Sequence, residues 1–149
     1  MFGIKESTER TLRDIGLLVL RAVPSLFMMS HGWGKMEKIF NGEMFNADFK
    51  WADPIGLGSH VSLMSAAGAE FACAAMVVVG FLTRVFAAPV AFTMLVAGFI
   101  VHSADPFGKK EMAFLYAAVF SAIILLGGGK YSVDHALVGM RARKKAKAK

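Results

Sequence analysis

The chain has 149 residues, of which 56% are hydrophobic and 19% are charged, and its formal net charge at pH 7 is +6. The apolar residues gather into runs long enough to cross a bilayer, which takes about 20 residues in a helix, and a soluble bundle of this size would then have too little polar surface. We therefore expect an integral membrane protein, and its single cysteine, Cys73, excludes an internal disulfide, a CxxC redox pair and a cysteine metal cluster.

Four apolar runs predict four membrane-spanning helices. They cover approximately residues 15–33, 60–82, 85–101 and 112–129. The last two runs are short for a full span, so we expect tilted helices or a locally thinned bilayer there. The expected fold class is therefore all-α: an antiparallel four-helix bundle in the membrane, formed by residues 15–129.

The basic residues predict the orientation of this bundle. Most of the 17 Lys and Arg residues fall on the side that holds segment 1–14, the turn at Arg84 and segment 130–149. Because cytoplasmic segments are enriched in Lys and Arg, we expect both termini in the cytoplasm and a multi-pass protein of the inner cell membrane. For the Lys-rich tail, anionic lipid headgroups are the expected partner, and nucleic acid is not.

The first span contains two residues that are unusual in lipid. Arg21 is costly near the middle of a span and needs a partner inside the bundle. Pro24 has no N–H to donate to the carbonyl of Leu20, so we expect a kink or a free carbonyl there. A long connection, residues 35–59, follows this span. Its aromatic residues predict a cap on the outer face of the bundle: Phe40, Phe45, Phe49 and Trp51.

The later spans carry few polar residues. The second span is rich in small residues, which let helices approach closely in lipid, and we expect its one acid, Glu70, to face another helix. The third span tolerates Pro89 near its first turn and ends at His102. Glu111 then opens the fourth span, where a negative charge suits the helix N-terminus.

Arg21 and Glu70 are predicted to form one group. Since a helix rises about 1.5 Å per residue, both fall in the middle third of the bilayer. Pairing inside the bundle is the usual resolution for such charges, so we expect direct contact or a shared hydrogen-bond network. Two interpretations remain open, namely a structural clasp and an orienting or proton-relaying pair beneath a ligand cavity.

A second group lies at the outer ends of the spans. We expect His31, Lys35, His102 and Glu111 to line one cavity under residues 36–59, with His60 as a weaker candidate. Imidazole and carboxylate could bind a metal, but no spacing here is a recognised ligand motif, and we predict no metal site. The alternative chemistry is hydrogen bonding and proton transfer to the carbonyls of a quinone. On this interpretation the catalytic candidates are His31, His102 and Glu111, and the cofactor-binding candidates are Arg21, Lys35, Glu70 and Tyr116. For each histidine taken alone, an interfacial side chain without a ligand remains the alternative.

A series of motifs extends from about residue 12 to residue 137. It comprises Leu20-Arg21, His31-Gly32, Lys35, Glu70, Gly80 to Arg84, His102, Glu111 to Tyr116 and Tyr131 to Asp134. In this order the motifs resemble the DoxX family of small four-helix membrane proteins. The resemblance implies four antiparallel helices with both termini inside. This chain differs from the family pattern at Gly127-Gly128-Gly129-Lys130, which has no proline, and it lacks the cysteine pair that some relatives would use for thiol–disulfide exchange.

The resemblance also implies two kinds of role. Some relatives look like the quinone-reducing membrane subunit of thiosulfate oxidation, and others are associated with oxidative stress and quinone detoxification. The sequence contains no flavin, haem or nucleotide motif, so redox chemistry would need a bound organic cofactor or a second redox subunit. We expect a component of a quinone-linked oxidoreductase system that binds a quinone or similar small molecule between its helices, with assembly into homo-oligomers left open. The alternative is a non-enzymatic membrane protein that binds lipid or anchors a partner protein.

Overall fold

The computed structural model describes residues 6–147 as helical segments and their connections, with side chains described as far as residue 140. The elements, in chain order, are α1 (Glu6–Phe40), η1 (Glu43–Phe45), α2 (Ser59–Ala67), η2 (Gly68–Cys73), α3 (Ala74–Val79), α4 (Thr83–Val96), η3 (Ala97–Val101), α5 (Phe107–Leu126) and α6 (Val133–Lys147). η1 is a 3₁₀ turn, whereas η2 and η3 are π-helical segments that continue the neighbouring α-helices. The predicted all-α fold class is confirmed, since these residues contain no strand.

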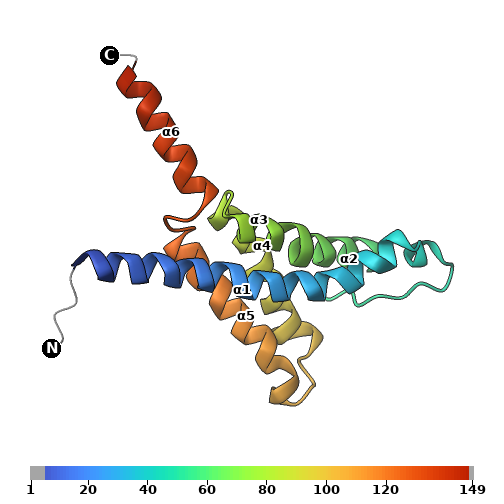
Figure 1. The fold of residues 1–149 in the computed structure, drawn as a ribbon. Coiled ribbons are helices and arrows are strands. Elements are labelled where there is room, and N and C mark those ends of the chain that lie inside the picture. The colour runs from blue at the N-terminus through green and yellow to red at the C-terminus, as the bar shows by residue number, and fades with distance from the viewer. Residues whose placement is uncertain (1–5, 148–149) are drawn as a thin grey trace.

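The helices form two antiparallel pairs. In Figure 1, α1 lies side by side with the rod formed by α2, η2 and α3, and the chain runs in opposite directions in the two. The rod formed by α4 and η3 pairs with α5 in the same way. α6 projects away from both pairs, at the end where α3 turns into α4 (Figure 1). The four membrane crossings and the cytoplasmic position of the termini stay predictions.

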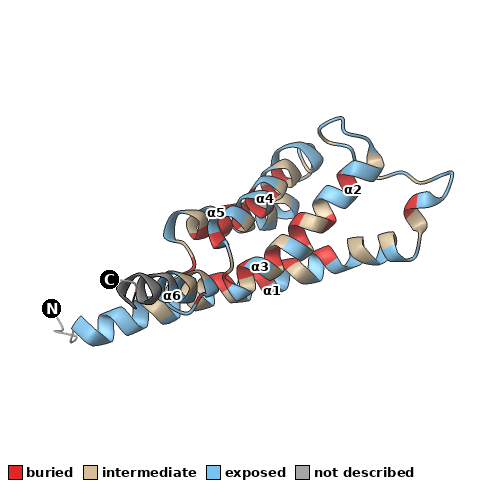
Figure 2. Cartoon of the chain, turned by 90° about the horizontal axis from the view of Figure 1, so that it is seen from above, coloured by how far each residue is buried: buried red, intermediate tan, exposed pale blue. Residues whose placement is uncertain are grey.

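The core lies between the two pairs, where Figure 2 shows the buried residues of α1 and α3 facing those of α4 and α5. It combines large side chains with the small and branched ones of α3 and α4: Met28, Ala74, Val77, Ala87, Val90, Phe120 and Ile123. The small residues of the second span were predicted to let helices approach closely. This is confirmed, because Ala74 packs in the core between the helices.

The outer surface of the bundle is apolar. Large exposed side chains occur on α1, α4, η3 and α5: Phe27, Phe92, Phe99, Leu115 and Leu125. Such a surface is unfavourable in water and suits lipid, in which helices satisfy their own backbone groups. Two helical segments, Ser59–Val79 and Thr83–Val101, are long and apolar enough to cross a bilayer.

Helix α1 extends beyond both predicted ends of the first span. It begins at Glu6, inside the segment 1–14, where an ion pair between Glu6 and Arg10 on successive turns supports the helix. It continues past Trp33 to Phe40 and stops before Gly42, whose φ of 74° is left-handed. Lys35 therefore lies on a helix and not in the connecting loop.

Candidate functional site

A cavity of about 400 Å³ lies between the rod α2–η2 and the rod α4–η3, under residues 51–57 of the long connection. We call it the loop cavity. Its walls are mainly apolar and include Trp51, Pro54, Ile55, Leu57, Ala66, Ala69, Phe92, Val96 and Val101. Its polar side chains are Lys35, Ser62, Ser65, Glu70, Thr93 and His102. An apolar cavity of this size with a few polar groups is typical of a small-molecule site.

Both π-helical segments border the loop cavity. η2 places Ala69 and Glu70 on its wall, and η3 places Ala97 and Val101 there. A π-helical turn is rare and occurs frequently at functional sites, because the extra residue interrupts the regular hydrogen-bond ladder. The sequence did not predict these two segments, since both have the apolar composition of an ordinary span.

The ion pair of the loop cavity is formed by Lys35 and Glu70. Lys35 Nζ lies 2.5 Å from Glu70 Oε2, and the two side chains are 22% and 5% exposed. Gly32, one turn before Lys35 on α1, makes this contact possible. A Cβ at Gly32 would lie 2.7 Å from the backbone nitrogen of Phe71, so only glycine lets α1 approach η2 so closely.

Asp53 holds the long connection over the cavity. Its carboxylate accepts hydrogen bonds from Ser62 Oγ at 2.7 Å and from the backbone N–H groups of Leu57 and Gly58, both at 2.8 Å. These hydrogen bonds, of which the one from Ser62 has the largest effect, keep the pKa of Asp53 below its usual value. Desolvation raises this pKa, but by less. The connection therefore covers the cavity, and Trp51 contributes to the wall. Its position on the outer face of the membrane stays a prediction.

His102 lies on the cavity wall where η3 ends. Its Nδ1 is 2.8 Å from Asp105 Oδ2, and Lys109 Nζ is 3.5 Å from the other carboxylate oxygen. The hydrogen bond from His102 is the main reason why the pKa of Asp105 lies below its usual value, and the charge of Lys109 acts in the same direction. An imidazole oriented through Nδ1 leaves Nε2 available for other hydrogen bonds.

The predicted pairing of Arg21 with Glu70 is wrong. Arg21 is 1% exposed and donates hydrogen bonds to three backbone carbonyls: those of Val77 at 2.9 Å, Val78 at 2.8 Å and Tyr131 at 2.9 Å. The last turn of a helix leaves carbonyls without partners and carries partial negative charge, so a guanidinium is well placed at the end of α3. Glu70 lies about two turns away along the same rod and is paired with Lys35.

The predicted common cavity of His31, Lys35, His102 and Glu111 is only partly correct. Lys35 and His102 line the loop cavity, whereas His31 and Glu111 are exposed and lie outside it. His31 packs edge-on against Tyr116, with 6.0 Å between the ring centres, so these two candidates form a separate contact between α1 and α5.

His60, the weaker candidate, has a structural contact. Its Nε2 lies 2.7 Å from the carbonyl oxygen of Met44, and its ring packs against Phe49.

The described part of the chain holds no group of three His, Cys, Asp or Glu side chains that could hold a metal ion.

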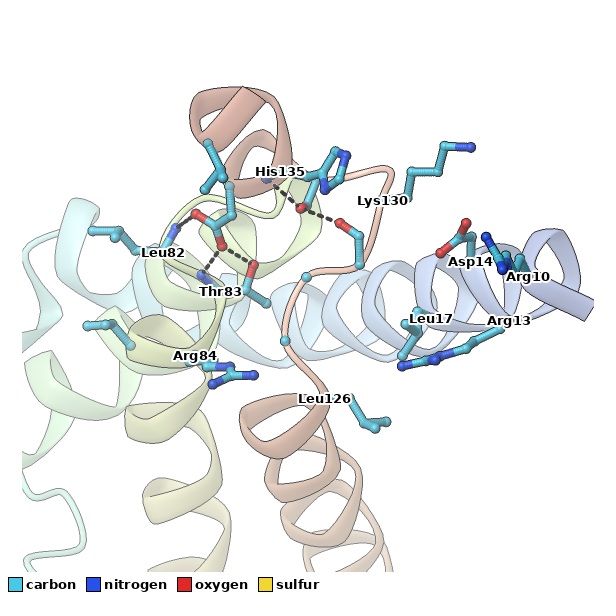
Figure 3. Close-up of a pocket in the computed structure, with 17 residues that line it drawn as sticks. Arg10, Arg13, Asp14, Leu17, Leu82, Thr83, Arg84, Leu126, Lys130 and His135 are labelled. Atoms are coloured by element: carbon cyan, nitrogen blue, oxygen red, sulfur yellow. Dashed lines mark hydrogen bonds between the residues drawn. The ribbon is translucent and has the colours of Figure 1, made fainter. Parts of the chain in front are cut away.

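Sequence reasoning missed the role of Asp134, at the opposite end of the bundle. Its carboxylate accepts hydrogen bonds from the N–H groups of Leu82 at 2.7 Å and Thr83 at 2.9 Å and from Thr83 Oγ1 at 2.8 Å (Figure 3). These are the first donors of α4, so Asp134 caps that helix from a distant part of the chain. The motif from Tyr131 to Asp134 could be recognised in the sequence. The sequence did not show that Asp134 binds the start of α4.

Comparison with known proteins identifies the family of this chain. The DoxX family model matches residues 16–103, more than half of the chain. The chain belongs to the DoxX family. It is also 27% identical over 132 residues to inner membrane protein YqjF of Escherichia coli (strain K12). The aligned region covers 86% of this chain and 96% of that protein. No solved structure matches the chain. As a DoxX-family membrane protein, it carries Lys35, Glu70 and His102 within the matched segment.

Proposed function

We propose that this DoxX-family protein binds a quinone or a similar small molecule in the loop cavity, as a component of a quinone-linked oxidoreductase system. The observation that carries the proposal is the combination of an apolar cavity of about 400 Å³ with one ion pair and one oriented imidazole on its wall. A quinone ring is flat and apolar, and its two carbonyl oxygens accept hydrogen bonds. It therefore matches a cavity that offers apolar contact and a small number of donors.

The polar residues supply the chemistry that a quinone needs. The ammonium group of Lys35 donates to one quinone oxygen. The imidazolium form of His102, which keeps its Nδ1–H bond to Asp105, donates from Nε2 to the other. Reduction to the quinol takes two electrons and two protons, so Lys35 and His102 are also the proton donors. Glu70 holds the side chain of Lys35 in place through their ion pair. The electrons come from a second redox subunit or a soluble donor. His31 and Glu111 have no part in this proposal, because they lie outside the cavity.

The second candidate function is lipid binding without catalysis. The apolar side chains of the cavity wall, such as Phe92, Val96 and Val101, suit an acyl chain as well as a ring. The two functions differ in what stays bound to the protein. Absorbance spectra and mass spectrometry of the organic extract of protein purified in mild detergent separate them, because a quinone supports the proposal and phospholipid alone supports the second function.

The direct test is titration of the purified protein with a short-chain ubiquinone, followed by quenching of tryptophan fluorescence. Trp51 lines the cavity and reports occupancy. Because a hydrogen bond from a charged group contributes about 1.5–3 kcal/mol, we expect Lys35→Met to weaken binding by about tenfold or more. The matched control is Lys38→Met on the same helix, since Lys38 pairs with Glu43 and does not line the cavity. Equal affinity of the two variants would contradict the proposal.

A further inference from the structure

A second cavity lies at the end of the bundle opposite the loop cavity. It has a volume of about 840 Å³ and lies between α1, the start of α4 and the chain from Leu126 to Ser132 (Figure 3). Its basic side chains come from three parts of the chain: Arg10, Arg13, Arg84 and Lys130. We call it the basic cavity.

Several of these cations retain donors for a ligand. Arg84 donates one hydrogen bond, from Nη2 to the carbonyl of Leu125 at 3.2 Å, and a guanidinium has further N–H groups. Within the described residues, Arg13 and Lys130 have no carboxylate within 4.0 Å, whereas Arg10 is paired with Glu6. The ammonium of Lys130 lies 5.9 Å from the centre of the Tyr131 ring.

The acids of the basic cavity do not neutralise it. The carboxylate of Asp134 is occupied by Leu82 and Thr83, and it lies near the charge of Arg21. Asp14 is the other acid on the wall. The cavity therefore keeps a net positive charge and attracts an anion.

The border of the cavity points to a lipid as the source of that anion. Leu82, Val85, Leu126 and Val138 line the cavity and are 47%, 61%, 51% and 66% exposed. Gly127 leaves space beside Arg84, since a Cβ there would lie 3.2 Å from Arg84 Nε. A free phosphate ion uses only the cations, whereas a phospholipid uses the cations and this apolar border together.

We propose that the basic cavity binds the phosphate headgroup of an anionic phospholipid, with the acyl chains against the apolar border. Arg84 and Arg13 contact the phosphate oxygens, because a guanidinium forms paired hydrogen bonds with phosphate. Lys130 adds a point charge on the wall. Basic pockets between membrane helices bind anionic headgroups in this way.

The test measures lipid binding to the full-length protein in detergent by native mass spectrometry. The probes are phosphatidylglycerol and phosphatidylcholine with the same acyl chains. We expect a preference for phosphatidylglycerol, which the variant Arg13→Gln/Arg84→Gln reduces by about tenfold. The control variant Lys50→Gln/Lys110→Gln removes the same charge away from the basic cavity and keeps the preference. Loss of the preference in both variants would overturn the proposal, because it would show a diffuse effect of net charge.

Two further measurements keep the test independent of folding defects. Asp14→Asn removes an acid from the cavity wall, so we expect tighter binding of phosphatidylglycerol, a gain that a misfolded protein would not show. Glycerol 3-phosphate provides the headgroup without acyl chains and should compete only weakly with the lipid. Unchanged or weaker lipid binding in Asp14→Asn, or full competition by glycerol 3-phosphate, would contradict a lipid site.

Discussion

Gly32→Ala tests the closest helix contact in the bundle. The added Cβ would lie 2.7 Å from Phe71 N, 2.8 Å from Glu70 C and 3.0 Å from Glu70 Cβ. Two of these three atoms belong to the backbone of η2, so no change of rotamer can relieve the contact. Ordinary contact begins at 3.4 Å, and α1 must therefore move away from η2 by roughly 0.7 Å.

The cost of this movement follows from known packing changes. Overpacking of a tight interface destabilises by about 1–3 kcal/mol, while replacing glycine by alanine within a helix gains up to about 1 kcal/mol. Gly16→Ala measures the gain alone, since Gly16 lies on the same helix and a Cβ there has nothing within 4 Å. We expect Gly32→Ala to be less stable than Gly16→Ala by about 1–3 kcal/mol.

The single thiol of the chain provides the assay. Cys73 is partly buried at the end of η2 and packs against the core, so a thiol-reactive fluorophore reports unfolding during heating. Gly32→Ala should unfold at a lower temperature than the wild type, and Gly16→Ala at the same or a higher one. The variant should also bind short-chain ubiquinone more weakly, because the shift separates Lys35 from Glu70. If Gly32→Ala and Gly16→Ala unfold at the same temperature, α1 and η2 are not in the contact described.

Three other substitutions test the remaining polar contacts. Asp134→Asn removes an acceptor for the first N–H groups of α4 and should cost about 1–2 kcal/mol in thermal unfolding, with the exposed Asp48→Asn as the control. Burial raises the pKa of Asp134, but the hydrogen bonds from Thr83 outweigh it and the pKa is lowered. The stabilisation by Asp134 is therefore complete above its unfolded pKa and is lost as the pH falls below about 4, so the pH dependence of unfolding should flatten in Asp134→Asn. Arg21→Lys should cost about 2–4 kcal/mol, because one ammonium cannot reach all three carbonyls that the guanidinium contacts; an unfolding temperature equal to the wild type would refute this role. Asp53→Asn should speed limited proteolysis within residues 46–58 and weaken quinone binding, and an unchanged cleavage rate would show that the connection is held by other contacts.

The sequence predicted the features that depend on composition and order along the chain. Apolar runs and small residues indicate packed helices in lipid, and the aromatic connection indicates a cap. Lys35 and His102 were placed correctly in one cavity, because each lies near the end of its helix at the same end of the bundle. His31 and Glu111 were predicted at the same level, but both are exposed and lie outside the cavity. A residue's level along a helix does not determine the face that it presents.

The pairing of Arg21 could not be predicted from the charges alone. Counting residues along the two spans gives the approximate depth of each residue in the bilayer. On that basis Arg21 was paired with Glu70, the one acid predicted at the same depth. The structure instead places Arg21 at the end of α3, where helix carbonyls lack intrahelical partners. Every residue type has a backbone carbonyl, so the sequence does not indicate which carbonyls lie free at a helix end. It therefore shows the charge of Arg21 but not the groups that accept its hydrogen bonds. The same holds for Asp134, whose partners are the N–H groups of Leu82 and Thr83.

The position of the loop cavity follows from how the two helix pairs are joined. At one end of the bundle, Arg21 donates hydrogen bonds both to the last turn of α3 and to the carbonyl of Tyr131. Asp134, three residues after Tyr131, accepts a hydrogen bond from the start of α4. Contacts of α4 with α3 and η2 hold the pairs together near this end, and from there α2 and the α4–η3 rod diverge (Figure 1). The π-helical segments η2 and η3 lie on the wall of the space that opens between them, and Lys35 crosses to Glu70 at its side. We therefore expect substitutions at Arg21 or Asp134 to alter the space between the two pairs and to reduce quinone affinity without touching the ligand.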